Sequence, residues 1–197
     1  MVTSPATERR GRLDRETVVL AAEALVDRDG YDALSMTSLA AELDSRVSSL
    51  YNHVGGLDDV RAEIQTRAMH LMGRQVQRAA MGRTGADGLA ALCHELRRFA
   101  LDYPRRYAAM THRAIEPDSL LEAAGEVIEA VGVMVRSTGL GGDRVIPTGM
   151  AIFSAIHGFV SLEAIGYFDG IDGLEAVYEQ VVRGAVTSAV LEVTTPR

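Results

Sequence analysis

The apolar residues of this chain recur at intervals of three and four along almost its whole length. In the first such stretch, Val18, Ala22 and Leu25 follow this spacing, which places them on one face of an α-helix. We expect Asp14 to cap the start of that helix and Gly30 to end it. No stretch has the alternating pattern of a strand, so the sequence predicts an all-α fold. The expected helices cover residues 14–29, 36–43, 47–53, 57–81, 87–103, 105–114, 118–136, 146–168 and 174–191.

The lengths of these helices divide the chain into two parts. Short helices fill residues 1–56, after a polar arm of eight to twelve residues. A long helix at 57–81 leads from them to further long helices. We therefore predict an N-terminal arm and three-helix domain over 1–56, and a larger helical domain over 57–197.

The composition limits where such a chain works. Cys93 is the single cysteine, so the fold does not depend on a disulfide or on an oxidising compartment. The first eight residues are polar and carry no signal peptide. No uninterrupted apolar run reaches the roughly 18 to 20 residues of a membrane span. The expectation is a cytoplasmic protein without a membrane partner.

The two short helices, which follow a longer helix and are joined by a tight turn, have the layout of a helix-turn-helix. In that layout the second short helix enters the DNA major groove, so its outward side chains need hydrogen-bonding ends. Val47, Leu50 and Val54 can hold this helix onto its support. The candidate DNA contacts are Arg12, Thr37, Arg46, Ser48, Ser49, Tyr51, Asn52 and His53.

The charge of the chain bears on this hypothesis. The net charge is −7, and residues 1–56 carry 6 arginines against 9 acidic residues. A negative chain binds DNA only where its positive charge is concentrated on one face. Arg9, Arg10, Arg12 and Arg15 form such a concentration near the N-terminus, which we interpret as a phosphate or minor-groove contact or as a solvated tail.

Residues 34–60 resemble the DNA-binding segment of the tetracycline-repressor (TetR) family. Ser35 and Thr37 stand at the cap of the first short helix, and the pair Leu39-Ala40 follows. The run from Ser49 to Val54 matches the end of the family pattern nearly in full. The resemblance covers about the first third of the chain and implies an operator-binding regulator.

Three positions depart from that pattern. Asp44 replaces the usual turn glycine, Ser45 replaces an aliphatic residue, and Leu57 replaces a lysine that would contact phosphate. We therefore expect a salt-sensitive phosphate contribution that is smaller than usual.

The C-terminal half resembles a TetR subgroup that is named for a Trp-His-Gly triplet. Ile156 takes the place of the tryptophan before His157 and Gly158. The resemblance implies that the last two helices pack against their symmetry mates in a homodimer, which would bind a palindromic operator. Small residues on these helices permit such close approach. The expected interface residues are Ile152, Ile156, Phe159 and, on the last helix, Val177 and Tyr178.

A small hydrophobic effector is the second expected partner, bound between the helices of the larger domain. Methionines adapt to irregular cavities, and aromatic side chains commonly line them. His112, His157 and Tyr107 are the expected polar contacts. The other candidate lining residues are Met69, Met72, Phe99, Tyr103, Met110, Met150 and Phe153.

Neither a cofactor nor catalysis is expected. Cys93, His94, His112 and His157 have no compact metal-ligand spacing, and packing or pocket lining is the simpler reading. No Gly-x-Ser-x-Gly elbow is present, although the sequence does not exclude a Ser-His-acid triad.

Two alternatives remain open. The chain could be a helical small-molecule-binding or enzymatic dimer whose N-terminal domain no longer binds DNA. The acidic residues and Leu57 favour this alternative, and the segment from Ser49 to Val54 argues against it. The chain could also be an activator or a ligand-independent regulator, because repression depends on where the operator lies.

Overall fold

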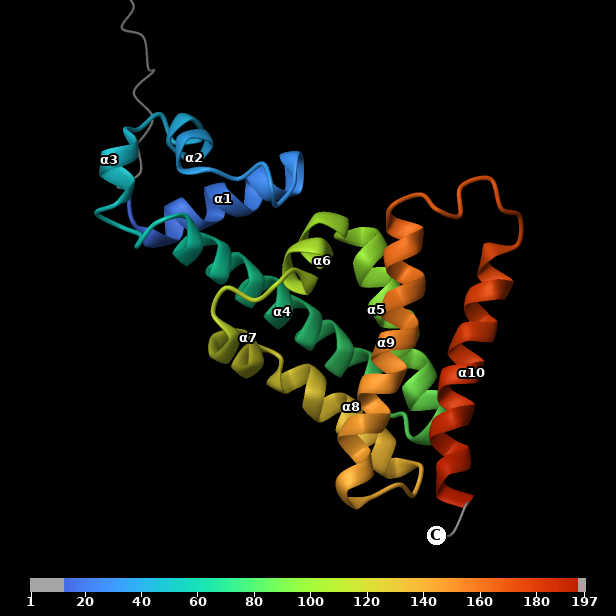
Figure 1. The fold of residues 1–197 in the computed structure, drawn as a ribbon. Coiled ribbons are helices and arrows are strands. Elements are labelled where there is room, and N and C mark those ends of the chain that lie inside the picture. The colour runs from blue at the N-terminus through green and yellow to red at the C-terminus, as the bar shows by residue number, and fades with distance from the viewer. Residues whose placement is uncertain (1–12, 195–197) are drawn as a thin grey trace, which may run out of the picture. The chain divides into compact units, whose positions relative to one another are not determined.

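The computed structural model describes residues 13–194, with side chains described as far as Ser188. Within that range every regular element of secondary structure is a helix (Figure 1). This confirms the all-α prediction. The chain forms two compact units, residues 1–64 and 65–197. Their division falls inside the long helix α4 (Leu57–Ala80), later in the chain than the boundary suggested by the sequence.

The first unit holds three helices and the beginning of α4. Both predicted caps are confirmed: Asp14 accepts a hydrogen bond of 2.8 Å from the backbone N–H of Thr17, and Ser35 accepts one of 3.0 Å from that of Ser38. These bonds satisfy donors that the first turn of a helix leaves unpaired. The elements are α1 (Arg15–Asp29), α2 (Met36–Glu42), α3 (Val47–Leu50) and the first turns of α4 (Leu57–Ala80).

The turn between α2 and α3 depends on Asp44. Its φ of 45° lies in the left-handed region, where glycine is favoured but aspartate is among the better tolerated side chains. The turn therefore keeps its conformation although aspartate replaces the usual glycine. Helix α3 is shorter than predicted, because it ends at Leu50 and the backbone continues in a turn in which His53 N–H bonds to the Leu50 carbonyl at 2.9 Å.

The core of the first unit is built from the apolar positions that the periodicity identified. Leu50 and Val54, on either side of the turn that follows α3, are fully or almost fully buried. They lie in the same unit as buried residues of α1, α2 and α4, so the polar face of this segment is held outward. The other buried apolar residues include Val18, Val19, Ala22, Leu25, Val26, Leu34, Leu39, Ala40, Val60 and Ile64.

The second unit contains the rest of α4 and all later helices. One predicted helix, at 118–136, is divided into two by Ala124. The predicted helix at 146–168 ends earlier, at Ala164, and the last helix is longer than predicted. The elements are α5 (Gly85–Asp102), α6 (Pro104–Thr111), α7 (Pro117–Ala123), α8 (Gly125–Ser137), a 3-10 turn (Gly142–Arg144), α9 (Val145–Ala164) and α10 (Leu174–Thr194).

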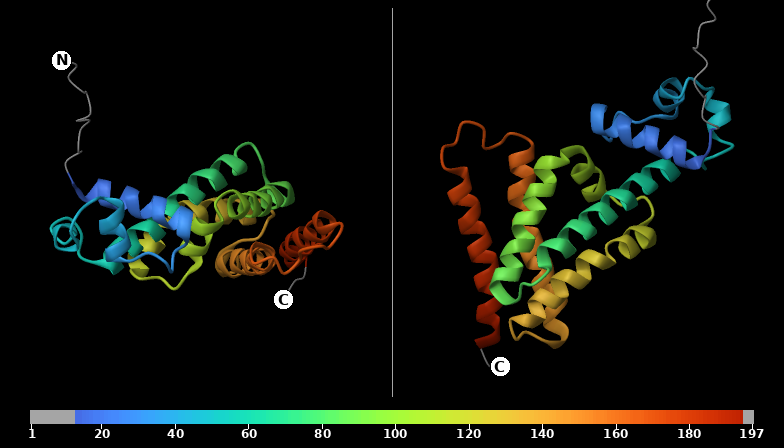
Figure 2. Two further views of the ribbon diagram at one scale, coloured as in Figure 1. Left: turned by 90° about the horizontal axis from the view of Figure 1, so that it is seen from above. Right: turned by 180° about the vertical axis from the view of Figure 1, so that it is seen from behind.

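Helix α5 is the centre of this unit, since it packs against α6, α8, α9 and α10. Helices α9 and α10 lie side by side, and Figure 2 shows them from two further directions. A polar cluster joins α5, α9 and α10. Arg97 pairs with Glu163 at 2.7 Å and with Glu175 at 2.6 Å, and its guanidinium lies 4.4 Å from the centre of the Tyr178 ring. The Tyr178 hydroxyl donates to the Cys93 carbonyl at 2.5 Å.

The segment Gly142–Ala164, which contains α9, is long and apolar enough to cross a membrane by length and composition alone. Polar residues such as Thr148, Ser154 and His157 interrupt it, so it is not the uninterrupted apolar run that the sequence analysis considered. A single such helix is weak evidence, because core helices meet the same criteria. In this structure α9 packs on α5, α8 and α10, and it buries Ile152, Ile156 and Phe159.

Candidate functional site

The segment from α3 to the start of α4 presents polar side chains on buried apolar support. Thr37 is exposed on the first turn of α2, and Arg46 and Ser48 are exposed at the start of α3. Tyr51 is 57% exposed, although it is aromatic. Asn52 is also exposed, whereas Ser49 and His53 are half-buried. Seven of the eight predicted contacts therefore share one short region, and Arg12 lies outside the described residues.

Asp59 fixes the end of this segment. Its Oδ2 accepts a hydrogen bond of 2.7 Å from the Gly55 N–H, and both its oxygens accept from the Arg15 guanidinium at 2.7 and 2.8 Å. The hydrogen bonds from Arg15, together with the bond from Gly55, lower the pKa of the Asp59 carboxyl. Helix α1 and the start of α4 are thus tied to the backbone that follows Tyr51. Sequence reasoning assigned no role to Asp59.

Arg46 differs from the other arginines of the described part of the first unit. Arg15 is paired with Asp59, and Arg28 with Asp29 and Glu42. Arg61 donates to the Leu34 carbonyl at 3.2 Å. Arg46 has no partner within residues 13–64 of the unit. Its positive charge is therefore available to an outside anion.

The second unit contains an apolar cavity of about 50 Å³ between α4, α5, α8 and α9. Phe153 is the one predicted ligand residue that lines it. Ile152 and Ile156, which the sequence analysis assigned to a dimer interface, also line it. The remaining walls are Val76, Leu89, Leu92, Cys93, Leu96, Val127, Val131 and Gly149.

The other predicted ligand residues are placed elsewhere. Tyr103, His112 and Met150 are exposed, although the Tyr103 ring packs against the ring of the buried Phe99, with centroids 5.2 Å apart. Met69 is half-buried at the edge of the core. Met72, Phe99, Tyr107 and Met110 are buried in the core without lining the cavity. Helical spacing alone identified these residues as apolar but could not say which interhelical space they face.

Two predicted polar contacts come together beside the cavity. The Tyr107 hydroxyl and His157 Nδ1 are 2.6 Å apart and form a hydrogen bond between α6 and α9. The Phe153 ring stacks on the His157 ring, with centroids 5.3 Å apart. Burial raises the pKa of Tyr107 and lowers that of His157. His157 does not itself line the cavity, but as a neutral histidine it can both donate and accept a hydrogen bond behind the lining Phe153 ring.

The predicted interface residues are covered by their own chain. Ile156 is 1% exposed, and Ile152, Phe159 and Tyr178 are also buried, because they face α5 or the space between α9 and α10. Only Val177 of the predicted set is exposed. The exposed face of α9 consists instead of apolar and small residues: Ile146, Met150, Ala151, Ser154, Ala155, Gly158, Leu162 and Ile165.

Burial also determines the acidity of the single cysteine. Cys93 is 3% exposed, and desolvation raises the pKa of its thiol to about 12. Within the described residues, no three His, Cys, Asp or Glu side chains form a group that could hold a metal ion.

Sequence comparisons match both halves of the chain. The family model of the tetracyclin repressor-like C-terminal domain matches residues 89–185. An HTH-type transcriptional regulator of Mycobacterium tuberculosis is 32% identical over 177 residues, which cover 88% of this chain and 80% of that protein. An HTH-type transcriptional regulator of Bacillus subtilis is 25% identical over 158 residues, which cover 80% and 82%.

Solved structures share the fold. A TetR variant from Acinetobacter baumannii, in complex with minocycline, superposes with a TM-score of 0.66 at 20% identity, covering 90% of this chain and 96% of that one. The TetR family protein ActR of Streptomyces coelicolor, in complex with (S)-DNPA, gives a TM-score of 0.62 at 20% identity and covers 93% and 100%. The fold, the recognition segment (residues 46–54) and the relatives agree, and the chain belongs to the TetR family of helix-turn-helix transcriptional regulators.

Proposed function

We propose that this chain is a homodimeric repressor that binds a palindromic operator and is released by a small hydrophobic effector. The observation that carries the DNA-binding part is the segment from Arg46 to His53. Its polar side chains are exposed while Leu50 and Val54 are buried, and Arg46 has no partner within the described part of its unit. An arginine in this position can donate two hydrogen bonds to a guanine edge or bind a phosphate.

The exposed face of α9 supports the dimer. Ala155, Gly158 and Leu162 lie on successive turns of this face, and Ile165 is 77% exposed at its end. Small residues at the centre of such a face let two helices approach closely, and the larger residues at its end contribute apolar area. Two-fold symmetry would set two recognition segments about 34 Å apart, one turn of DNA.

The cavity supports an apolar effector. All of its lining residues are apolar, but about 50 Å³ is far below the roughly 300 Å³ of a typical ligand pocket. An effector must therefore open the cavity by moving one of its walls. Val76 places α4 among those walls, and α4 begins at Leu57, directly after the recognition segment. We infer that the effector weakens operator binding by displacing α4.

The test is a gel-shift titration against DNA from upstream of the gene and against a selected random-sequence operator, at several salt concentrations. The double variant Arg46→Ala, Tyr51→Ala should weaken binding at least about tenfold, because one good base contact is worth about 1–3 kcal/mol. Arg105→Ala, which removes an exposed arginine from the second unit, is the matched control and should change affinity little. Binding that is indifferent to the double variant, or absent from both DNA sources, would refute the proposal.

A further inference from the structure

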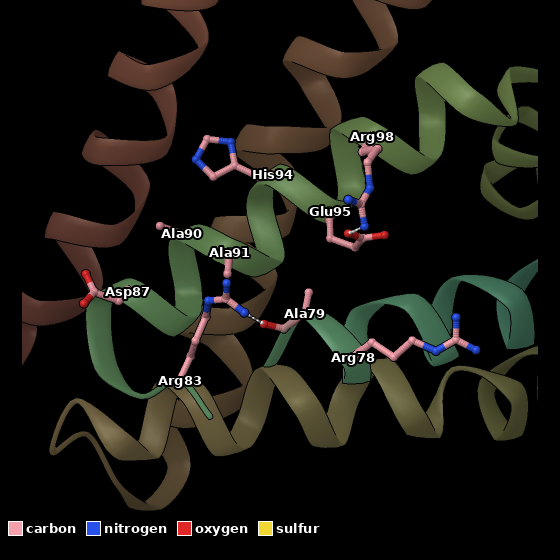
Figure 3. Close-up of a pocket in the computed structure, with 9 residues that line it drawn as sticks. All are labelled: Arg78, Ala79, Arg83, Asp87, Ala90, Ala91, His94, Glu95 and Arg98. Atoms are coloured by element: carbon pink, nitrogen blue, oxygen red, sulfur yellow. Dashed lines mark hydrogen bonds and ion pairs between the residues drawn. The ribbon is translucent and has the colours of Figure 1, made fainter. Parts of the chain in front are cut away.

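A second and larger cavity lies on the other side of α5, away from the apolar one. It is a groove of about 590 Å³, bounded by the end of α4, the loop that follows it and α5 (Figure 3). Its lining is mixed in charge, with three arginines and two acidic residues. The charged side chains are Arg78, Arg83, Arg98, Asp87 and Glu95.

Glu95 is the unusual member of this lining. Its side chain is only 4% exposed, and its Oε1 meets no donor among the described residues. Its other oxygen accepts from the Arg98 guanidinium, which is itself 67% exposed and therefore moves at little cost. Buried carboxylate oxygens are normally paired with donors. Glu95 is thus placed to receive a donor from a molecule in the groove.

The arginines on the α4 side of the groove form no ion pair within the described residues. Arg83 donates to the Ala79 carbonyl at 2.8 Å and to no acid within the described residues. Arg78 is exposed and has no ion pair in that part of the chain. His94 also lines the groove, but its Nε2 lies 3.6 Å from Oε1 of Glu179 in α10 and not beside the arginines. Figure 3 shows the Arg78 guanidinium pointing away from Arg83, so Arg83 is the arginine of this side that an acidic group in the groove can pair with.

The mixed lining selects against ligands that carry one sign of charge. A simple anion can pair with an arginine but leaves Glu95 Oε1 without a donor, and a simple cation can pair with Glu95 but is repelled by the arginines. We propose that this groove binds a small zwitterion, with its acidic group at Arg83 and its ammonium group at Glu95. This site is separate from the apolar cavity, which has no charged lining residue.

The proposal is tested by calorimetric titration of the full chain in the absence of DNA. The probes are the twenty free proteinogenic amino acids together with γ-aminobutyrate and 5-aminovalerate, which separate the two charges further. Acetate and methylammonium carry the same groups singly. At least one zwitterion should bind once per chain with a Kd below about 1 mM, and neither single-charge probe should bind comparably.

Variants locate the site. Arg83→Ala, and separately Glu95→Gln, should each weaken binding of the zwitterion at least tenfold, while Arg105→Ala should leave it unchanged. Glu95→Gln keeps the side-chain shape, and circular dichroism checks that each variant is folded. The proposal is overturned if no zwitterion binds, if acetate or methylammonium binds equally well, or if the variants bind as the native chain does. Because no DNA is present, its failure is independent of operator binding.

Discussion

Replacement of Gln65 by leucine tests how α4 is held in the second unit. Gln65 is the first residue of that unit and is 1% exposed. Its Nε2 donates to the carbonyls of Ala109 at 3.2 Å and Arg113 at 3.1 Å, and its Oε1 accepts from the Ile115 N–H at 3.0 Å. One amide therefore joins α4 to the end of α6 and to the loop before α7.

The expected loss in the free energy of unfolding follows from these three hydrogen bonds. Leucine has a similar size but leaves the Arg113 carbonyl and the Ile115 N–H without this partner, while the Ala109 carbonyl keeps only the His112 N–H at 3.3 Å. A typical hydrogen bond contributes about 0.5–1.5 kcal/mol, and a buried group left unpaired costs more. Two of the three bonds are only partly buried, so water can replace part of what is lost. We expect Gln65→Leu to lower the free energy of unfolding by about 2–4 kcal/mol.

The assay is urea denaturation followed by far-UV circular dichroism, with the midpoint and slope fitted for both proteins. Gln77→Leu is the matched control, since Gln77 is an exposed glutamine on the same helix, and it should change the free energy by less than about 0.5 kcal/mol. A loss below about 1 kcal/mol for Gln65→Leu would show that the three bonds do not hold α4.

Three further predictions concern single side chains. Asp59→Asn should cost about 1 kcal/mol at pH 7, because its pair with Arg15 is partly exposed. Its carboxyl pKa is lowered in the fold, so this contribution decreases progressively as the pH falls below about 4, and a cost that does not decrease over that range would contradict the prediction. The lowered pKa of His157 means that the unfolded chain binds its proton more readily, so stability should fall below about pH 6.5, and urea midpoints at pH 7.5 and 5.5 should differ less in His157→Gln. Ile156→Ala should cost about 2–4 kcal/mol in urea denaturation by enlarging the apolar cavity, whereas Ile128→Ala, at a 48% exposed isoleucine of α8, should cost clearly less, and equal losses would rule out the assigned burial.

Local features of the structure were predictable because they depend on neighbours in sequence. A helix cap needs a side-chain oxygen and an N–H two or three residues later, so Asp14 and Ser35 could be identified without a fold. The polar outer face and apolar inner face of the segment after Arg46 follow from helical spacing in the same way. Asp44 was identified as a departure, but only the observed φ shows how the turn accepts it.

The assignment of faces in the second unit was not predictable to the same degree. Helix α9 is apolar on nearly every side, so its periodicity does not distinguish a face toward α5 from a face toward a partner. Ile152 and Ile156 were therefore assigned to the interface, although they line the cavity. Glu95 has an ordinary position in the sequence of α5, and its burial results from packing between segments that only the fold brings together.

The reactivity of the buried Cys93 can report on the opening of the apolar cavity. Cys93 lines that cavity, and with a thiol pKa of about 12 only about one molecule in 100,000 carries the reactive thiolate at pH 7. A thiol reagent added to the closed protein should therefore react very slowly. Any motion that parts α4 from α5 hydrates this sulfur and restores its ordinary acidity. The rate at which Cys93 is alkylated thus measures how often the cavity opens, without an added probe and before any effector is known.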